Sequence, residues 1–234
     1  DLSTGINPVP YPIGKLSSSV WSRLPELNAE TALLSKASAY YKLPASAKIV
    51  ISPGTQALIQ WLPRLILKSK VFILGPTYSE HAHCWSSAGH IVKVIDLGSS
   101  PPDCAEVIIA VNPNNPDGYI HNPKDLTSLV RPDRLVIVDE AFADTQPDCS
   151  IIPATGQPGL IVLRSFGKFF GLAGTRLGFA VTDTKMANKI SEALGPWPVT
   201  GPTLEIGTKA FSDTSWITET RLRLRNDANL LDSI

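Results

Sequence analysis

The stretch Leu160-Ile161-Val162-Leu163-Arg164-Ser165-Phe166-Gly167-Lys168 joins an uninterrupted apolar run to a polar segment that ends in a lysine. A short branched apolar run without alternation is typical of a strand that is buried on both faces of a parallel sheet. Six further runs of similar length occur along the chain. Together the runs predict seven strands, at residues 48–51, 71–74, 91–95, 106–111, 135–138, 160–163 and 178–181.

Amphipathic helical patterns separate many of these runs. They occupy residues 57–65 and 126–130, and a further one at 27–40 precedes the first strand. Alternating strands and helices indicate an α/β fold, with a mainly parallel seven-stranded sheet sandwiched by helices. From Thr203 onward one long helical pattern runs to the end of the chain. We expect an amino-terminal arm (1–15), a large domain (16–202) and a linking helix (203–234) that leads into an incomplete small domain.

The composition narrows the class of ligand. The chain has 234 residues, of which 43% are hydrophobic, and its 21 basic side chains balance 21 acidic ones. A net charge of zero gives no field that would hold a nucleic acid or an anionic membrane. No apolar run approaches the roughly 18 residues that cross a bilayer. We therefore expect a small-molecule substrate, and neither nucleic acid nor membrane as a partner.

The cysteines and histidines suggest neither a disulfide framework nor a metal site. Cys84, Cys104 and Cys149 form no C-x-x-C pair, which fits a reducing cytoplasm. His81 and His83 are two residues apart in a helical pattern, so they do not share a helix face on which both could bind a metal. We expect a cytoplasmic protein without a metal.

Residues that directly follow strands are the candidates for chemistry, because ligands in open α/β sheets bind at the carboxyl ends of the strands. Gly54-Thr55-Gln56 opens a helix after the first strand. Its free N–H groups can hold a phosphate, although an ordinary helix start has the same composition. The other three such segments are 112–118, 139–142 and 165–168.

Single residues in these segments each allow two interpretations. Lys168, among aromatic and small neighbours, is either a nucleophilic amine suited to a Schiff base or a surface lysine. Asp139 ends a buried strand and needs a partner, either a protonated pyridine nitrogen or a structural arginine. Arg176, which lies between two glycines, either approaches an oxyanion or forms a structural ion pair.

Together, a phosphate cradle, an Asn amide, a strand-end Asp and a Schiff-base Lys are the groups that pyridoxal phosphate requires. The chain contains N-P-N-N-P-x-G at 112–118, V-D-E-A-F at 138–142 and S-F-G-K-x-x-G-L-A-G-x-R-x-G at 165–178. On these motifs it resembles the fold-type-I pyridoxal-phosphate enzymes of the class I/II aminotransferase family, over nearly its whole length. The resemblance implies the large domain of that fold and a homodimer with its active sites at the subunit interface.

The resemblance also implies roles for individual residues. Lys168 carries the cofactor as a Schiff base and then moves the substrate's proton, and Asp139 pairs with the pyridinium nitrogen. Asn115 donates to the phenolic oxygen, and Tyr78 either stacks on the ring or packs in the core. These four are the expected catalytic residues. The full expected cofactor site is Gly54, Thr55, Gln56, Tyr78, Asn115, Asp139, Phe142, Ser165, Lys168 and Arg176.

The opening segment D-L-S-T-G-I-N-P-x-P-Y-P (1–12) narrows the resemblance. It is similar to the amino-terminal signature of the threonine-phosphate decarboxylases of cobalamin biosynthesis, which are relatives of the histidinol-phosphate aminotransferases. This implies that Gly5, Ile6 and Asn7 contact a phosphorylated amino-acid substrate. It also implies decarboxylation of L-threonine O-3-phosphate to (R)-1-aminopropan-2-yl phosphate. Transamination of another phosphorylated amine and a non-catalytic cofactor-binding sensor stay open as alternatives.

Decarboxylation and transamination differ in which bond of the substrate Cα stands perpendicular to the cofactor ring. By resemblance, the arginine that fixes the substrate carboxylate lies in the small domain. We expect it beyond the end of this chain, which begins without Met and stops inside a helical pattern. Arg221, Arg223 and Arg225 lie in that last pattern, and we expect them to be solvated.

Three residues depart from the family pattern. Phe142 stands where relatives often have Tyr, whose hydroxyl helps to stabilise the phenolate of the cofactor. Gly167 stands where many relatives have Ser. Leu24, in Arg23-Leu24-Pro25, replaces the aromatic residue of an R-Y-P segment, so a cross-subunit tyrosine contact to the cofactor phosphate is not expected.

Overall fold

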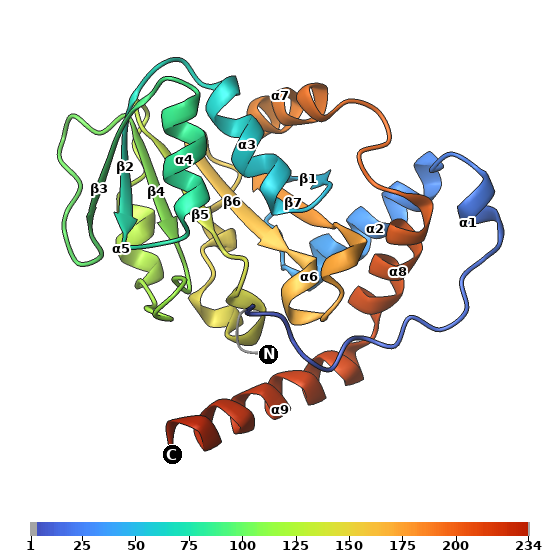
Figure 1. The fold of residues 1–234 in the computed structure, drawn as a ribbon. Coiled ribbons are helices and arrows are strands. Elements are labelled where there is room, and N and C mark those ends of the chain that lie inside the picture. Colours follow the sequence, from blue (N-terminus) through green and yellow to red (C-terminus); the bar gives the residue numbers. More distant parts are fainter. Residues whose placement is uncertain (1–3, 234) are drawn as a thin grey trace.

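A computed structural model describes residues 4–233 (Figure 1). The strands are β1 (Lys48–Ser52), β2 (Lys70–Gly75), β3 (Ile91–Asp96), β4 (Val107–Val111), β5 (Leu135–Asp139), β6 (Leu160–Ser165) and β7 (Gly178–Thr182). The helices are α1 (Ser19–Ser22), α2 (Leu27–Tyr40), α3 (Thr55–Leu65), α4 (Ser79–Ser87), α5 (Pro123–Ser128), α6 (Phe166–Phe169), α7 (Thr184–Leu194), α8 (Gly201–Ser212) and α9 (Thr214–Asp232). Short 3-10 turns occur at Ala143–Thr145, Pro147–Cys149, Ile152–Ala154 and Ala173–Thr175.

The seven strands form one sheet in the order β1-β7-β6-β5-β4-β2-β3. Neighbours from β3 to β6 pair in parallel, whereas β7 is antiparallel to both β6 and β1. Six strands therefore run in one direction, and β7 alone runs in the other. The predicted seven strands and their mainly parallel arrangement are confirmed.

Helices cover both faces of the sheet, as the continuous apolar strands predict (Figure 1). Successive strand residues point to opposite faces. Val136, Val138 and Val162 pack into the core that includes residues of α2 and α8. Ile137, Ile161 and Leu163 pack into the core that includes residues of α3, α4 and α7.

The end of the chain differs from the prediction, because it forms two helices rather than one. Asp213 separates α8 from α9 with a non-helical backbone (φ −88°, ψ 78°), and its carboxylate accepts a hydrogen bond from the Trp216 N–H at 3.0 Å. This is an N-cap, which starts a new helix. Helix α8 packs closely on α2, since a Cβ added at Gly207 would lie 2.8 Å from Leu33 Cδ1. The prediction of a single helix from Thr203 was therefore wrong, and α8 completes the large core.

The carboxyl ends of six strands meet at one edge of the sheet. Because β7 is antiparallel, its first residue, Gly178, lies at the same edge and pairs with Ser52 at the end of β1. The amino-terminal arm runs along this part of the molecule, beside α9 (Figure 1). The segments in which the sequence places chemistry are thus brought together.

Candidate active site

A cavity of about 250 Å³ opens at this edge of the sheet. It combines residues from the ends of β1, β4, β5 and β6 with the residues before β7 and after β2. All ten residues that the sequence assigns to the cofactor line it: Gly54, Thr55, Gln56, Tyr78, Asn115, Asp139, Phe142, Ser165, Lys168 and Arg176.

Lys168 lies in α6, a single helical turn that directly follows the buried Ser165. The side chain is half-buried, and its Nζ lies 5.2 Å from the centroid of the Phe142 ring. A Cβ added at Gly167 would lie 2.7 Å from the Ala173 Cα, which is backbone and cannot move aside cheaply. This explains the departure at Gly167, because the turn leaves no room for a side chain beside the lysine.

Asp139 is 4% exposed at the end of β5 and has two hydrogen-bond partners. Its Oδ1 accepts from the Ala141 N–H at 3.0 Å, and its Oδ2 lies 3.0 Å from His81 Nε2. His81 is buried in α4, three residues after Tyr78. From the sequence, His81 was considered only as a metal ligand, and this pairing was missed. Its position three residues after Tyr78, a predicted cofactor-site residue, was the available signal.

The start of α3 and Arg176 form a cradle suited to a phosphate. Gly54 caps the helix with φ 80°, and the first turn of α3, whose N–H groups have no partner within the helix, lines the cavity with Thr55 and Gln56. A Cβ added at Gly54 would lie 2.7 Å from Arg176 Nη2, and one at Gly178 would lie 2.5 Å from the Thr55 nitrogen. Gly54 leaves room for the guanidinium, and Gly178 leaves room for the backbone at the start of α3, whereas a Cβ at Gly174 would meet nothing within 4 Å.

Tyr78 and Gln56 belong to one hydrogen-bonded group at the mouth of the cavity. The Tyr78 hydroxyl donates to Gln56 Oε1 at 3.2 Å, and Gln56 Nε2 donates to Glu80 Oε2 at 2.7 Å. Burial, and secondarily the charge of Glu80, raise the pKa of Tyr78 above its usual range. Tyr78 is 39% exposed and lines the cavity, so core packing does not account for it.

The Asn-rich turn presents one asparagine to the cavity. The Asn112 amide donates to the Cys149 carbonyl at 2.9 Å, and the Asn114 amide donates to the Pro76 carbonyl at 3.0 Å. Only Asn115 of these three lines the cavity. The structure therefore selects the residue that the resemblance implied.

A second cavity of about 440 Å³ adjoins the first and shares Ile6, Ala141, Phe142 and Lys168 with it. The arm residues Gly5, Ile6 and Asn7 line this second cavity, while residues 1–3 of the arm signature lie outside the described residues. A Cβ added at Gly5 would lie 2.6 Å from Phe142 Cε1, so the glycine allows the arm to pack directly on that ring. Lys168 thus lines both cavities.

Arg221 and Arg223 are not the solvated side chains that we expected. Arg221 donates to the Asp144 carbonyl at 2.7 Å and to the Tyr40 hydroxyl at 2.9 Å. Arg223 donates to Asn7 Oδ1 at 2.7 Å. The reason is that the first part of α9 lies against the large domain and the arm, whereas residues 225–233 are exposed (Figure 1). Arg225 is exposed, as expected.

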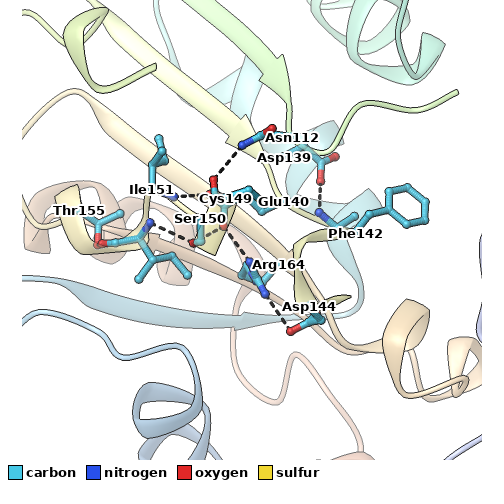
Figure 2. Close-up of polar contacts among 12 residues, drawn as sticks. Asn112, Asp139, Glu140, Phe142, Asp144, Cys149, Ser150, Ile151, Thr155 and Arg164 are labelled. Atoms are coloured by element: carbon cyan, nitrogen blue, oxygen red, sulfur yellow. Dashed lines mark hydrogen bonds and ion pairs between the residues drawn. The ribbon is translucent and has the colours of Figure 1, made fainter. Parts of the chain in front are cut away.

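A buried charge cluster lies behind the cavity and was not predicted from the sequence. Arg164, 2% exposed, donates to Glu140 at 2.7 Å and to Asp144 at 2.8 Å (Figure 2). Glu140 also accepts from the Ser150 hydroxyl and the Ile151 N–H, and burial raises its pKa. In Figure 2 the Phe142 ring points away from this cluster. Of the acidic residues Asp139, Glu140 and Asp144, only Asp139 lines the first cavity.

Neither a metal-binding cluster nor a membrane-spanning helix is found in residues 4–233. In this part of the chain no group of three or more His, Cys, Asp or Glu side chains is placed to hold a metal ion. None of its helices is both long and apolar enough to cross a bilayer.

Comparison with known proteins identifies the family. The sequence profile of the class I and II aminotransferases matches residues 15–233. The chain belongs to this family. The resemblance that the sequence motifs indicate is thereby confirmed, and the class I/II aminotransferase fold accounts for the sheet order and for the position of the cavity.

Several curated relatives within this family are named for phosphorylated compounds. The chain is 42% identical over 219 residues to a threonine-phosphate decarboxylase of Pseudomonas aeruginosa, covering 91% of this chain and 65% of the relative. It is 43% identical to a Sinorhizobium protein of the same name, covering 88% and 63%. A histidinol-phosphate aminotransferase of Blochmanniella floridana is 30% identical, covering 82% and 60%. The chain thus spans a little under two thirds of the length of these relatives.

Solved structures share the fold. L-threonine-O-3-phosphate decarboxylase from Porphyromonas gingivalis superposes with a TM-score of 0.78 at 21% identity, covering 90% of this chain and 70% of that one. Histidinol-phosphate aminotransferase from Sinorhizobium meliloti, solved in complex with pyridoxal 5'-phosphate, gives 0.77 at 19% identity, covering 93% and 65%. Both carry the mixed α/β sheet described above.

The first cavity fits pyridoxal phosphate by the chemistry of its groups. It offers one primary amine, one carboxylate at the far wall and a helix start with an adjacent guanidinium, which suit an aldehyde, a pyridinium nitrogen and a phosphate. The close approach of Arg176 to Gly54, where a side chain would collide, is a cradle of this kind.

Proposed function

We propose that the chain forms the large domain of a pyridoxal-phosphate-dependent decarboxylase. It would convert L-threonine O-3-phosphate to (R)-1-aminopropan-2-yl phosphate in cobalamin biosynthesis. The observation that carries the proposal is the single cavity that brings the Lys168 amine, the Asp139 carboxylate and the phosphate cradle together. The choice of substrate is supported by the relatives of 42% and 43% identity.

Each residue of the cavity has a task in this proposal. Bound pyridoxal phosphate supplies an aldehyde for attachment to an amine and a ring that withdraws electrons from the substrate Cα. Gly54, Thr55, Gln56, Ser165 and Arg176 hold the phosphate group. Asp139 keeps a proton on the ring nitrogen, and His81 fixes the orientation of that carboxylate. Tyr78 and Asn115 hold the ring in place.

Lys168 moves the proton. Its amine borders both cavities, so it reaches the cofactor on one side and a substrate on the other. In decarboxylation the amine delivers a proton to Cα as CO2 leaves. Gly5 and Ile6 form the arm side of the substrate space, and Phe142 lines both this space and the cofactor cavity.

Transamination is the second candidate, favoured by the 30% identical histidinol-phosphate aminotransferase. It uses the same cavity residues and differs in the orientation of the substrate. With hydrogen perpendicular to the ring, Lys168 removes the Cα proton instead of delivering one.

The test uses full-length protein loaded with pyridoxal phosphate and given O-phospho-L-threonine. CO2 release with the cofactor aldehyde retained over many turnovers is the expected result. Loss of the aldehyde without CO2 would move the protein to the aminotransferases. No spectral change and no CO2 would exclude both enzymes and favour the non-catalytic sensor.

The proposal also includes a cytoplasmic homodimer, with a large domain that runs from residue 16 through α8. An exposed apolar surface supports a dimer interface, since it includes Trp21, Leu24 and Trp197, which are 70%, 64% and 55% exposed. Sedimentation of the full-length protein tests this, and a monomer at micromolar concentration would refute it.

A further inference from the structure

The amino-terminal arm has an unusual backbone, because Pro8, Pro10 and Pro12 leave N–H groups only on Asn7, Val9 and Tyr11 between residues 7 and 12. All three are hydrogen-bonded. Asn7 donates to the Lys168 carbonyl at 3.0 Å, Val9 to Asn7 Oδ1 at 3.1 Å, and Tyr11 to the Phe170 carbonyl at 2.9 Å. The prolines fix the backbone φ angles of the segment and reduce the entropy lost on docking.

The arm caps the turn that carries Lys168. Helix α6 is a single turn, and a helix that short has several carbonyls without an intrahelical partner. The Asn7 side-chain amide donates to the Phe169 carbonyl at 2.9 Å. The carbonyls of residues 168, 169 and 170 therefore all accept from the arm. A Cβ added at Gly171 would lie 2.7 Å from the Asn7 carbonyl oxygen, so this glycine permits the close approach.

Helix α9 holds the arm in this position at two points. Arg223 donates to Asn7 Oδ1 at 2.7 Å, and the Trp216 ring packs edge-on against Tyr11 with centroids 5.2 Å apart. Asn7 is 7% exposed, and both polar atoms of its side chain have protein partners. Asn7 is thus built into the protein at the wall of the second cavity, which is different from the direct substrate contact that the sequence suggested.

We propose that Asn7 and Arg223 are positioning residues for Lys168. Arg223 orients the Asn7 side chain, Asn7 caps the turn of α6, and the turn fixes where the Lys168 amine stands between the two cavities. The position of α9 thereby affects the position of the Lys168 amine. The inference rests on the proposed function only for the catalytic role of Lys168, since the contacts themselves belong to the protein without its cofactor.

The first measurement is hydrogen exchange of the Asn7, Val9 and Tyr11 amides in full-length protein. Arg223→Ala removes a charge-assisted hydrogen bond, and we expect these amides to exchange about tenfold faster. Asn226→Ala is the control, because Asn226 is exposed on the same helix and does not line the second cavity. Its exchange should equal that of the wild type. Equal exchange in the Arg223 and Asn226 variants would overturn the proposal.

The second measurement reports on Lys168 itself. Acetylation by acetic anhydride is compared with that of the exposed Lys185 in the cofactor-free protein. We expect the relative rate at Lys168 to rise at least threefold in Arg223→Ala and in Asn7→Ala, and to return toward the wild type in Arg223→Lys. Faster arm exchange with unchanged Lys168 labelling would also overturn the proposal.

Turnover separates this inference from the proposed function. In the loaded enzyme, Arg223→Ala should lower kcat at least fivefold while KM changes less than twofold, because the amine is displaced and Arg223 does not itself line the second cavity, the proposed substrate space. A wild-type protein that neither loads cofactor nor releases CO2 would refute the proposed function. The exchange and labelling results would still decide whether the arm positions Lys168.

Discussion

Strands β5 and β6 end in polar residues on both faces of the sheet, and the two faces differ in how those residues are used. On the face toward α3 and α4, Asp139 and Ser165 border a cavity beside a half-buried lysine. On the opposite face, Glu140 and Arg164 bond to each other, and Arg164 also bonds to Asp144, with less than 3% of each side chain exposed. Residues one position apart therefore line a cavity on one face and form a buried ion-pair cluster on the other, because strand side chains alternate.

Substitution of Lys168 should produce the largest effect on the cavity face. Lys168→Ala removes both the attachment point of the cofactor and the proton carrier, so turnover should fall at least about 10³-fold. The free energy of unfolding should change by less than about 1 kcal/mol, since the side chain is only half-buried. CO2 release and urea denaturation measure the two quantities. Activity within tenfold of the wild type would refute a catalytic role for Lys168. If the protein is instead a non-catalytic sensor, the substitution should leave its output unchanged.

On the opposite face of the sheet, substitution of Arg164 should instead have its main effect on the free energy of unfolding. Arg164→Met leaves the Glu140 and Asp144 carboxylates buried without their shared cation, so unfolding should become easier by about 3–5 kcal/mol. The control is Arg131→Met, which breaks the Arg131–Asp103 pair on the surface, with side chains 49% and 93% exposed, and should change stability little. Urea denaturation of the two variants decides. Equal midpoints would mean that the cluster carries no net stability.

His81 lies on the same face of the sheet as the cavity and contacts Asp139 without lining the cavity itself. His81→Ala removes one partner of a buried carboxylate, a loss of about 1.5–3 kcal/mol that corresponds to roughly a 10–100-fold fall in kcat. His83→Ala is the matched control, because His83 is exposed on the same helix. We expect His83→Ala to match the wild type. Identical kcat values for the two variants would show that Asp139 needs no help from His81.

The same comparison explains what the sequence could predict. Continuous apolar runs revealed the strands, and the carboxyl-edge rule correctly predicted that Gly54, Asp139 and Lys168 lie near one another. Both rules depend on neighbours along the chain or on strand direction. They therefore succeed where a strand is buried on both faces of the sheet and where the candidate residues directly follow a strand.

These rules could not predict which side chains from distant parts of the sequence contact each other. Arg164 and Glu140 both lie in or next to predicted strands, but nothing local shows that their side chains meet in the core. Arg223 reaches Asn7 across 216 positions of sequence. The division between α8 and α9 is different, because Asp213 is a standard N-cap residue and the signal was present in the sequence. The uninterrupted apolar spacing on both sides of it concealed that signal.

Substitution of Phe142 should have the smallest effect on turnover, because Phe142 contributes only an aromatic ring to the lining of the first cavity. The structure places this ring 5.2 Å from Lys168 Nζ and directly against Gly5. Phe142→Tyr adds a hydroxyl donor, which stabilises a phenolate and should lower, by up to about one pH unit, the pH at which the absorbance of bound cofactor changes. Turnover should change less than about fivefold.

The control for this titration is Tyr78→Phe, which removes a hydroxyl whose partner is Gln56 and should leave the absorbance titration in place. A shift in Phe142→Tyr alone would show that the para position of residue 142 faces the phenolic oxygen. An unchanged titration would show that it does not, and the ring would then serve to seat the arm. In that case the larger change should come from Gly5→Ala, whose methyl group would collide with Phe142 Cε1 and displace the arm from the second cavity.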